Sequence, residues 1–363
     1  MARLSAPLDA SDLGCEARLL DTGLRKSIIG QDEAIVQIVN VYQVFLTGMH
    51  APGRPVGNFL FLGPTGSGKT HIVEATAEIL TGSARAVVKI DCGEFQHSHE
   101  IAKLIGSPPG YLGHRETHPM LSQETLNQYV TERFKLSFVL FDEIEKASDA
   151  LWNLLLGILD KATLTLGDGR KVDFSSSLIF MTSNVGAAAM SALTNPRLGF
   201  VSPNPGERLN DKVAQTGVEA ARRKFTPEFI NRLDKIVVFR SLGDAELRQI
   251  LDLELALVQE RVFQSQNAKP FVFSVTAEAK DYLLREGTDV KYGARHLKRA
   301  VERTLVQPMS NLIASGQIQQ GDWVRTDYDP TADRMAFFLE AENVSPYVMA
   351  EMVKTSPSLS AAA

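Results

Sequence analysis

A glycine-rich stretch in the first quarter of the chain has the spacing of a phosphate-binding loop. It fits G-x-x-x-x-G-K-[ST] with Gly63, Pro64, Thr65, Gly66, Ser67, Gly68, Lys69 and Thr70. In such a loop the glycines let the backbone curl around an anion, the lysine reaches the terminal phosphates, and the last hydroxyl ligates Mg²⁺. The stretch follows an apolar run at residues 59–62 and opens a helical pattern. We therefore predict a nucleotide site in which Lys69 binds phosphate and Thr70 binds magnesium.

Two adjacent acids supply the other half of such a site. Asp142 and Glu143 directly follow an apolar run at residues 138–141. Ligands of open α/β sheets bind at the carboxyl ends of the strands, which is where these acids would lie. Two acids at a strand end are usually a solvated turn, and only the phosphate loop upstream favours a site. With that loop, we expect Asp142 to hold Mg²⁺ through water and Glu143 to polarise the attacking water.

The elements that must position these residues are short apolar runs separated by helical patterns. The runs are residues 59–62, 86–90, 138–141, 178–181 and 236–239. Their nearly continuous apolar character is typical of parallel strands that are buried on both faces. Helical patterns lie between them, for example at residues 69–80 and 150–161. The predicted fold is therefore α/β, with a three-layer P-loop NTPase domain.

The pattern changes after Leu242 and predicts a smaller, mainly helical α+β domain. Expected helices span residues 244–266, 277–286 and 295–315, the last one bent at Pro308, and expected strands span 323–328 and 335–339. The predicted organisation is an N-terminal extension (1–23), a large domain (24–241), a small domain (242–340) and a flexible tail (341–363). The tail is rich in Ser, Pro and Ala, a composition that resists a fixed fold.

Composition and charge exclude several classes of protein. The chain has 363 residues, of which 44% are apolar and 22% charged, so disordered and collagen-like chains are excluded. A formal charge of −5 argues against nucleic acid or an anionic membrane as partner. No apolar run precedes Asp9, and Cys15 and Cys92 stand alone without a zinc or disulfide pattern. We expect a soluble protein of the reducing cytoplasm.

Several further stretches, in this order, resemble one known family. They are residues 28–34 (IIGQDEA), 106–113 (GSPPGYLG), 182–184 (TSN), 225–234 (FTPEFINRLD) and 292–295 (YGAR). Together with the phosphate loop and the paired acids, which look like the family's Walker A and Walker B motifs, they resemble an AAA+ ATPase. Within that superfamily the chain is similar to the second ATPase module of the Clp chaperones, which are ring-forming unfoldases and disaggregases. The resemblance covers about residues 24–339.

The resemblance implies ATP and Mg²⁺ as cofactors and hydrolysis of ATP to ADP and phosphate, and it assigns roles to single residues. Asn184 is similar to sensor 1, which helps to orient the hydrolytic water. Arg232 looks like the arginine finger that reaches into a neighbouring subunit's site. Arg295 resembles sensor 2, which reports the γ-phosphate, while Ile28 and Ile29 resemble the residues flanking adenine.

The resemblance also implies a mechanical role. Tyr111 and Leu112 match the loop that lines the central pore of the family's ring and grips a threaded polypeptide. The family's second aromatic is replaced here by His114. A predicted hairpin at residues 164–174 resembles the secondary pore loop. The implied function is a homohexameric ring that hydrolyses ATP at subunit interfaces and pulls a protein substrate through its pore.

Two alternatives remain open at this point. Residues 198–200 (LGF) resemble the apolar-Gly-apolar tripeptide with which some Clp members dock on a peptidase ring, so the chain could serve a compartmental protease. It could instead remodel one dedicated complex without threading. About 23 residues precede Leu24, too few for an independent domain. We therefore expect a single module whose substrate is selected by the pore, the tail or an adaptor.

Overall fold

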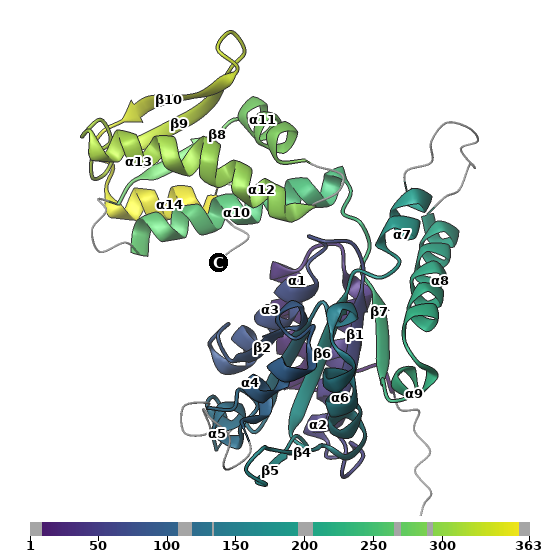
Figure 1. Cartoon of the computed structure of the whole chain (residues 1–363). Coiled ribbons are helices and arrows are strands. Elements are labelled where there is room, and N and C mark those ends of the chain that lie inside the picture. Colours follow the sequence, from purple (N-terminus) through teal and green to yellow (C-terminus); the bar gives the residue numbers. More distant parts are fainter. Residues whose placement is uncertain are drawn as a thin grey trace, which may run out of the picture. The chain divides into compact units, whose positions relative to one another are not determined.

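A computed structural model describes residues 9–107, 118–132, 134–194, 206–264, 270–288 and 293–355. The chain forms two compact units (Figure 1). The first comprises Met1–Leu62, Lys69–Gly186 and Ala214–Val238, and the second comprises Gly63–Gly68, Ala187–Val213 and Phe239–Ala363. The last of these segments begins three residues before the domain boundary that the sequence predicts. The assignment of the other two segments to the second unit has no counterpart in the prediction.

The first unit is built on a five-stranded parallel sheet with the strand order β2-β3-β6-β1-β7. Its strands are β1 (Gly57–Leu62), β2 (Val87–Asp91), β3 (Ser137–Asp142), β6 (Ser177–Ser183) and β7 (Lys235–Val238). Each of the five apolar runs identified in the sequence forms one of these strands. The predicted α/β class is confirmed.

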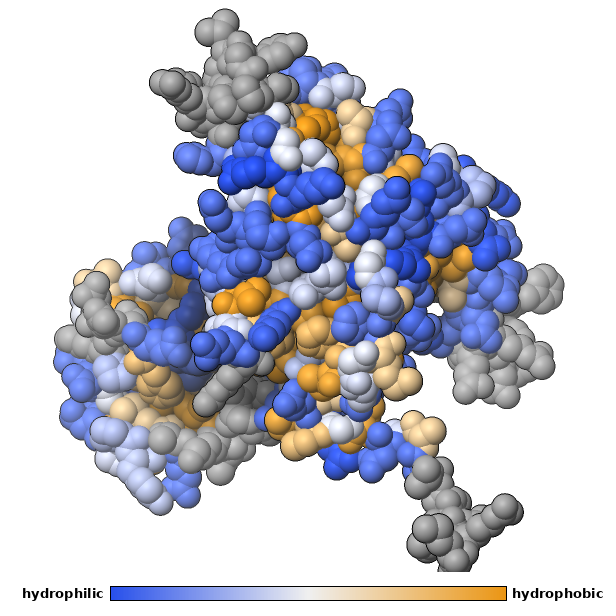
Figure 2. Space-filling view, turned by 90° about the horizontal axis from the view of Figure 1, so that it is seen from below, coloured by the Kyte–Doolittle hydropathy of each residue, from blue (hydrophilic) through white to orange (hydrophobic). Residues whose placement is uncertain are grey.

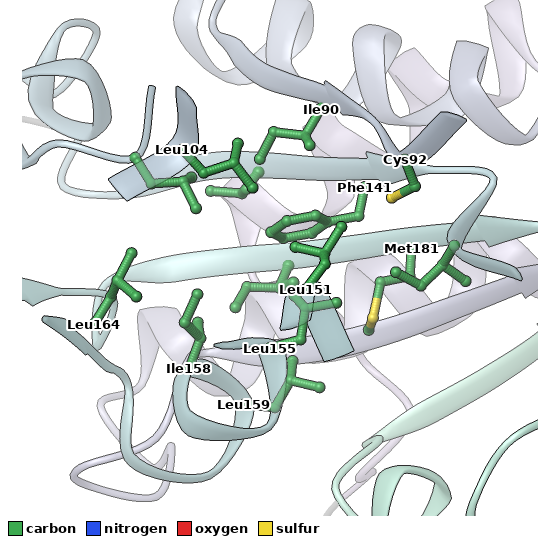
Figure 3. Packing of buried hydrophobic residues seen from close by; sticks show 14 of the residues in the cluster. Ile90, Cys92, Leu104, Phe141, Leu151, Leu155, Ile158, Leu159, Leu164 and Met181 are labelled. Atoms are coloured by element: carbon green, nitrogen blue, oxygen red, sulfur yellow. The ribbon is translucent and has the colours of Figure 1, made fainter. Parts of the chain in front are cut away.

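Both faces of this sheet are buried, as the unbroken apolar runs require. Alternate residues of a strand point to opposite faces. On one face, Phe141 and Met181 join a cluster with Leu151, Leu155 and Ile158 of helix α6 (Asp149–Lys161), as Figure 3 shows. The strand residues of the other set, such as Phe59, Phe138 and Phe180, are at most 1% exposed. Helices therefore cover the sheet on both sides and give three layers.

Of the other helices of the first unit, the sequence predicts Lys69–Thr81 by its residue range and not the rest. These helices are α1 (Cys15–Ser27), α2 (Asp32–Leu46), α3 (Lys69–Thr81), α4 (Ala102–Ile105), α5 (Gln123–Asn127) and α9 (Pro227–Ile230). Helix α1 packs against α2 and α3 and buries Ala17, Leu20 and Leu24 completely. Residues 15–23 of the expected N-terminal extension thus lie in a helix of the first unit. The spacing of these apolar residues is helical, but charged residues between them interrupt any continuous run.

The second unit has a three-stranded sheet with the order β10-β9-β8, in which β9 and β10 are antiparallel and β8 and β9 are parallel. Its strands are β8 (Val272–Val275), β9 (Trp323–Asp329) and β10 (Arg334–Ala341). Its helices are α7 (Ala187–Thr194), α10 (Asp244–Gln264), α11 (Ala277–Gly287), α12 (Ala294–Val301), α13 (Gln307–Ala314) and α14 (Pro346–Thr355), while α8 (Gly206–Lys224) runs across the boundary of the units. The predicted small, mainly helical α+β domain is confirmed, and β8 is an addition to it.

Two details of the second unit differ from the prediction. The single helix expected over residues 295–315 consists of α12 and α13, joined by a π-helical turn at Glu302–Val306 just before Pro308. A proline lacks the N–H for a regular helical hydrogen bond, so a local change of winding beside it is expected. The tail was expected to lack a fixed fold, but α14 forms within it and buries Met349. The sequence Ser345-Pro346 is a helix-start signal that the overall composition obscured.

Polar and apolar side chains are both exposed at the surface. On the face shown in Figure 2, hydrophilic residues cover most of the surface and apolar ones appear between them in small groups. Every helix in the part of the chain that the structure describes is too short or too polar to cross a membrane.

Candidate active site

The glycine-rich loop joins strand β1 to helix α3, as its sequence position predicts. Gly66 (φ 78°) and Gly68 (φ 96°) adopt backbone conformations that residues with a Cβ rarely take, and they let the chain turn sharply. The Ser67 hydroxyl donates to the Pro64 carbonyl at 2.9 Å. Lys69 begins α3 and is only 8% exposed. The loop therefore ends at a helix N-terminus, the end whose free N–H groups and dipole favour an anion.

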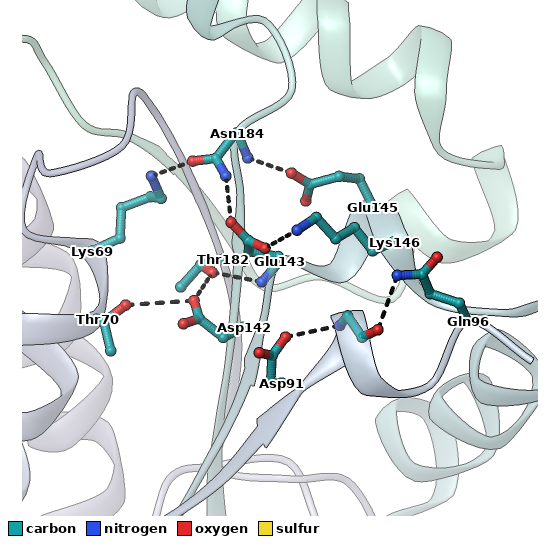
Figure 4. A network of polar contacts seen from close by, with 11 residues as sticks. Lys69, Thr70, Asp91, Gln96, Asp142, Glu143, Glu145, Lys146, Thr182 and Asn184 are labelled. Atoms are coloured by element: carbon teal, nitrogen blue, oxygen red, sulfur yellow. Dashed lines mark hydrogen bonds and ion pairs between the residues drawn. The ribbon is translucent and has the colours of Figure 1, made fainter. Parts of the chain in front are cut away.

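The carboxyl ends of the neighbouring parallel strands bring the other polar residues together. Asp142 is the last residue of β3. Thr182 is the second-to-last residue of β6, the strand next to β3. Asn184 follows the end of β6 directly. Figure 4 shows these side chains converging with Lys69 and Thr70 from the start of α3.

Two hydroxyls and one carboxylate form the part of the site that could hold a metal ion. The Thr70 hydroxyl donates to Asp142 Oδ1 at 3.4 Å, and the Thr182 hydroxyl donates to the same oxygen. Thr182 Oγ1 also accepts the backbone N–H of Glu143 at 3.0 Å. Hydroxyl and carboxylate oxygens are the donors that Mg²⁺ prefers. The donor set thus fits Mg²⁺, with Thr70 and Asp142 as the residues that would hold it.

Asn184 connects the lysine of the loop to two of the acids. Its Oδ1 accepts a hydrogen bond from Lys69 Nζ at 3.0 Å, and its Nδ2 donates to Glu143 Oε1 at 3.1 Å. Its backbone N–H donates to Glu145 Oε1 at 2.9 Å. One amide side chain therefore touches both the residue expected to bind phosphate and the residue expected to activate water (Figure 4).

Glu143 is held as an ionised acceptor in a strained backbone position. Its φ of 55° and ψ of 52° lie in the left-handed region, where a non-glycine residue is uncommon and usually has a functional reason. Lys146 forms an ion pair with its carboxylate. The hydrogen bond from Lys146 is the main factor that lowers the pKa of Glu143, and the bond from Asn184 and the charge of Lys69 lower this pKa further. At neutral pH the carboxylate is thus available to accept a proton or a hydrogen bond.

Three further residues, Thr182, Glu145 and Lys146, complete this network, and the sequence predicts no role for them. A short 3₁₀ turn, Ile144–Lys146, follows Glu143 and places the latter two beside it. Their signal in the sequence was a run of charged residues immediately after a buried strand. Thr182 belongs to the stretch 182–184 that resembles the family, but a threonine near the end of a strand is ordinary and indicates no role by itself.

Arg232 lies elsewhere on the sheet. It sits between α9 and β7, three residues before the start of β7 at Lys235. Strand β7 runs parallel to β1, with Lys235 beside Phe59 and Val238 beside Leu62. Arg232 therefore lies at the end of the sheet where the strands begin, whereas Asp142 lies at the opposite edge, where the strands end. Its guanidinium donates to Glu228 at 2.8 Å and lies 3.8 Å from Asp160. Within the described subunit, Arg232 is therefore separated from the cluster around Asn184.

Arg295, Ile28 and Ile29 are the remaining residues that the sequence predicts to contact the nucleotide. Arg295 is exposed in the first turn of α12, whose first N–H, that of Ala294, donates to the Gly66 carbonyl at 3.3 Å within the second unit. Ile28 is buried and Ile29 half-buried in the link between α1 and α2. The roles of these three residues toward a nucleotide stay predictions.

The predicted pore elements are only partly visible. The hairpin expected at residues 164–174 is present as β4 (Thr163–Thr165) paired antiparallel with β5 (Lys171–Asp173). Tyr111 and Leu112 of the expected pore loop lie outside the described residues, as do His114 and residues 198–200.

Known protein families match most of the chain. Residues 54–236 match the family model of the AAA domain (Cdc48 subfamily), and residues 242–326 match that of the C-terminal, D2-small domain of ClpB protein. The chaperone protein ClpB of Bdellovibrio bacteriovorus is 38% identical over 305 residues, which are 84% of this chain and 33% of that protein. The ATP-dependent Clp protease ATP-binding subunit ClpC of Staphylococcus aureus is 37% identical over 311 residues, 85% of this chain and 36% of that protein.

A solved structure has the same fold over most of the chain. It is a closed-state cryo-EM reconstruction of Hsp104 with ATPγS and FITC casein, with a TM-score of 0.74 and 29% identity over 89% of this chain and 52% of the Hsp104 chain. The chain spans about a third of the length of the curated relatives it matches.

Proposed function

This chain belongs to the AAA+ ATPases and has the domain pair of a Clp-type module, and on that premise we propose that it is an ATP-driven protein unfoldase or remodelling chaperone. In this proposal the chain assembles into a ring of copies of itself, binds ATP between neighbouring subunits, and couples hydrolysis to pulling a polypeptide. The observation that carries the proposal is the bridge from Lys69 through Asn184 to Glu143. A bound γ-phosphate would compete for Lys69 and so change what holds the base.

The residues around Asn184 have different roles in the proposed hydrolysis. Lys69 would bind the terminal phosphates, and Thr70 and Asp142 would hold Mg²⁺. When bound, this ion would neutralise negative charge on the phosphate. Glu143 is a carboxylate at neutral pH, held in place by Lys146 and Asn184, and it accepts a proton from the water that attacks the γ-phosphoryl group. The bond to the leaving ADP then breaks, and phosphate is released.

Arg232 would act on a neighbouring subunit's nucleotide. Its position at the edge of the sheet opposite to Asp142 makes action on its own site geometrically unfavourable. In a ring, that edge of one subunit can face the nucleotide edge of the next. A guanidinium placed there stabilises negative charge that develops on the γ-phosphoryl group.

The unfolding activity is proposed from the chain's relatives and from its sequence. Relatives are named chaperones, and the Hsp104 reconstruction contains casein together with a nucleotide analogue. Tyr111 is the residue that we propose grips the substrate, since an aromatic ring offers a large contact area without reading sequence.

Thr182→Val is expected to lower ATP turnover by about 10- to 100-fold and to raise the Mg²⁺ concentration needed for half-maximal turnover, the usual cost of losing a residue that orients a metal ligand. Valine keeps the shape of this buried side chain but removes the hydroxyl that contacts Asp142 and accepts the Glu143 N–H. The measurement is steady-state ATPase activity over a Mg²⁺ titration. Thr182→Ser, which keeps the hydroxyl, is the control, and equal losses in both variants would contradict the orienting role.

Tyr111→Ala tests the proposed function directly. Loss of the aromatic grip is expected to slow the unfolding of a stable fluorescent reporter protein by roughly tenfold, the equivalent of about 1.4 kcal/mol, while ATP turnover persists. Tyr111→Phe keeps the ring and is expected to unfold the reporter at nearly the wild-type rate. Full unfolding by the alanine variant would favour the alternative, a remodelling ATPase that does not thread its substrate.

A further inference from the structure

The turn that carries Arg232 is fastened to the segment that leads into strand β1. The backbone carbonyl of Arg232 accepts two side-chain hydrogen bonds, one from Arg54 at 3.2 Å and one from Asn58 Nδ2 at 3.1 Å. Arg54 and Asn58 lie more than 170 positions away in the sequence. A loop carbonyl that receives two long-range side-chain donors has its position fixed from two directions.

A second set of bonds continues this fastening along the chain. The Asn58 N–H donates to Asp234 Oδ2 at 2.8 Å, and the Asp234 N–H donates to the Asn58 carbonyl at 3.0 Å. The Arg54 guanidinium lies 3.9 Å from the Asp234 carboxylate. The pairing of β1 with β7 begins at Phe59 and Lys235. These contacts therefore continue the attachment between the two segments to the residues before the first pair, as far as Arg232.

The Arg232 side chain is supported from the same place. The Asn58 amide also donates to the Leu159 carbonyl at 3.2 Å, and Leu159 precedes Asp160, whose carboxylate lies 3.8 Å from Arg232 Nε. Asn58 itself is fully buried. One buried amide therefore ties the backbone of Arg232 to the end of the helix that carries one of its carboxylate neighbours.

The helix just before Arg232 is anchored independently. Phe229 of α9 is 1% exposed, and its ring meets that of Trp152 edge to face, with the centroids 4.7 Å apart. This aromatic contact pins α9 to α6, and Ile230 also packs against the hydrophobic core. The Arg232 carbonyl, two residues further on, is held by Arg54 and Asn58.

We propose that Arg54 and Asn58 are positioning residues for Arg232: they fix the backbone from which its guanidinium reaches the nucleotide of the neighbouring subunit. The inference rests on the proposed function, because it assumes that Arg232 acts between subunits. A displacement of about 1 Å can cost roughly 100-fold in rate when a group must meet a reacting centre, so a fixed backbone matters here. Strand β1 then serves two sites, since its far end leads into the subunit's own phosphate loop.

Arg54 allows the test without disturbing the core. Its side chain is 37% exposed, so its removal leaves no cavity of the kind that loss of a core residue leaves. Asn58, by contrast, is fully buried, and its removal would take away a donor from the carbonyls of Leu159 and Arg232. Arg54→Ala is therefore the informative variant, and its thermal unfolding is measured beside that of the wild type.

The experiment measures how much Arg232 of one subunit contributes to ATP turnover in the neighbouring subunit, with and without Arg54. Subunits carrying Glu143→Gln, which disables their own site, are mixed with wild-type subunits in increasing proportion before ATP is added, and ATP turnover is measured. A second series uses Glu143→Gln combined with Arg54→Ala. At equal mixing, the second series is expected to fall about twofold below the first, because half of the remaining active sites then receive Arg232 from a subunit without Arg54.

Two further series separate the possible outcomes. Glu143→Gln with Arg232→Ala should show the same additional fall, whereas Glu143→Gln with Arg18→Ala, which removes an exposed arginine paired with Asp12, should follow Glu143→Gln alone. If only the Arg232 series shows the fall, the positioning role of Arg54 is overturned and the proposed function stands. If the Arg232 series does not show it either, action of Arg232 between subunits is overturned, and with it this inference.

Discussion

Glu143→Gln is expected to lower ATP turnover by about 10²- to 10⁴-fold while ATP binding is retained, which is the usual range for loss of a general base. The amide has nearly the size and shape of the carboxylate, and its oxygen can still accept the hydrogen bond from Asn184. It has no affinity for a proton at neutral pH, so the attacking water is no longer activated. Binding should persist because Lys69, Thr70 and Asp142 are untouched.

The measurement pairs steady-state turnover with equilibrium binding of a fluorescent ATP analogue. Glu94→Gln is the matched control, since it removes one exposed carboxylate that follows the neighbouring strand β2. The variant should also hold its ATP long enough to keep the ring and any engaged polypeptide together, so it can serve to capture substrates. Turnover near the wild-type level in Glu143→Gln would show that another group is the base.

Arg232→Ala is expected to reduce ATP turnover by about 10³-fold or more, the range found for arginine fingers in phosphoryl transfer. The physical reason is the loss of a cation at the point where negative charge develops, in a site from which water is largely excluded. The structure gives this prediction a second, sharper part. Since Arg232 lies at the edge of the sheet opposite to Asp142, the defect should belong to the neighbour's site.

Mixing two inactive variants tests that second part. A Lys69→Ala subunit has no working site of its own but still offers Arg232, whereas an Arg232→Ala subunit keeps a complete site and lacks the finger. Mixed rings should therefore recover ATP turnover that neither variant has alone. Arg232→Lys keeps the charge but not the planar fork of donors, so it should recover little activity by itself. Mixtures that restore nothing at any ratio would place Arg232 in its own subunit's site.

Strands were the most predictable part of the fold, because a strand buried on both faces reads as a nearly continuous apolar run. Helix α1 escaped notice for the complementary reason. Only one side of it faces the protein, so its three completely buried residues, Ala17, Leu20 and Leu24, are diluted by charged neighbours. Helix α14 was hidden in a similar way by the Ser- and Ala-rich composition around it.

The site was predictable where a short motif by itself fixes the positions of its residues. The phosphate loop places Lys69 and Thr70 by local backbone shape, and the strand end places Asp142 and Glu143. The bridge through Asn184 needed the order of the strands, which sets β6 beside β3 and cannot be deduced from either strand alone. The bonds from Arg54 and Asn58 to Arg232 depend in the same way on β7 joining β1.

The left-handed backbone of Glu143 sets stability and catalysis against each other at one position. A non-glycine residue in this conformation costs roughly 1–3 kcal/mol, and a glycine would relieve that cost. Glycine, however, has no side chain that could accept the proton. Substitution by glycine would thus stabilise the fold and remove the proposed base, a local form of the trade-off between stability and activity. The proposed base therefore lies at a position where backbone conformation alone would favour glycine.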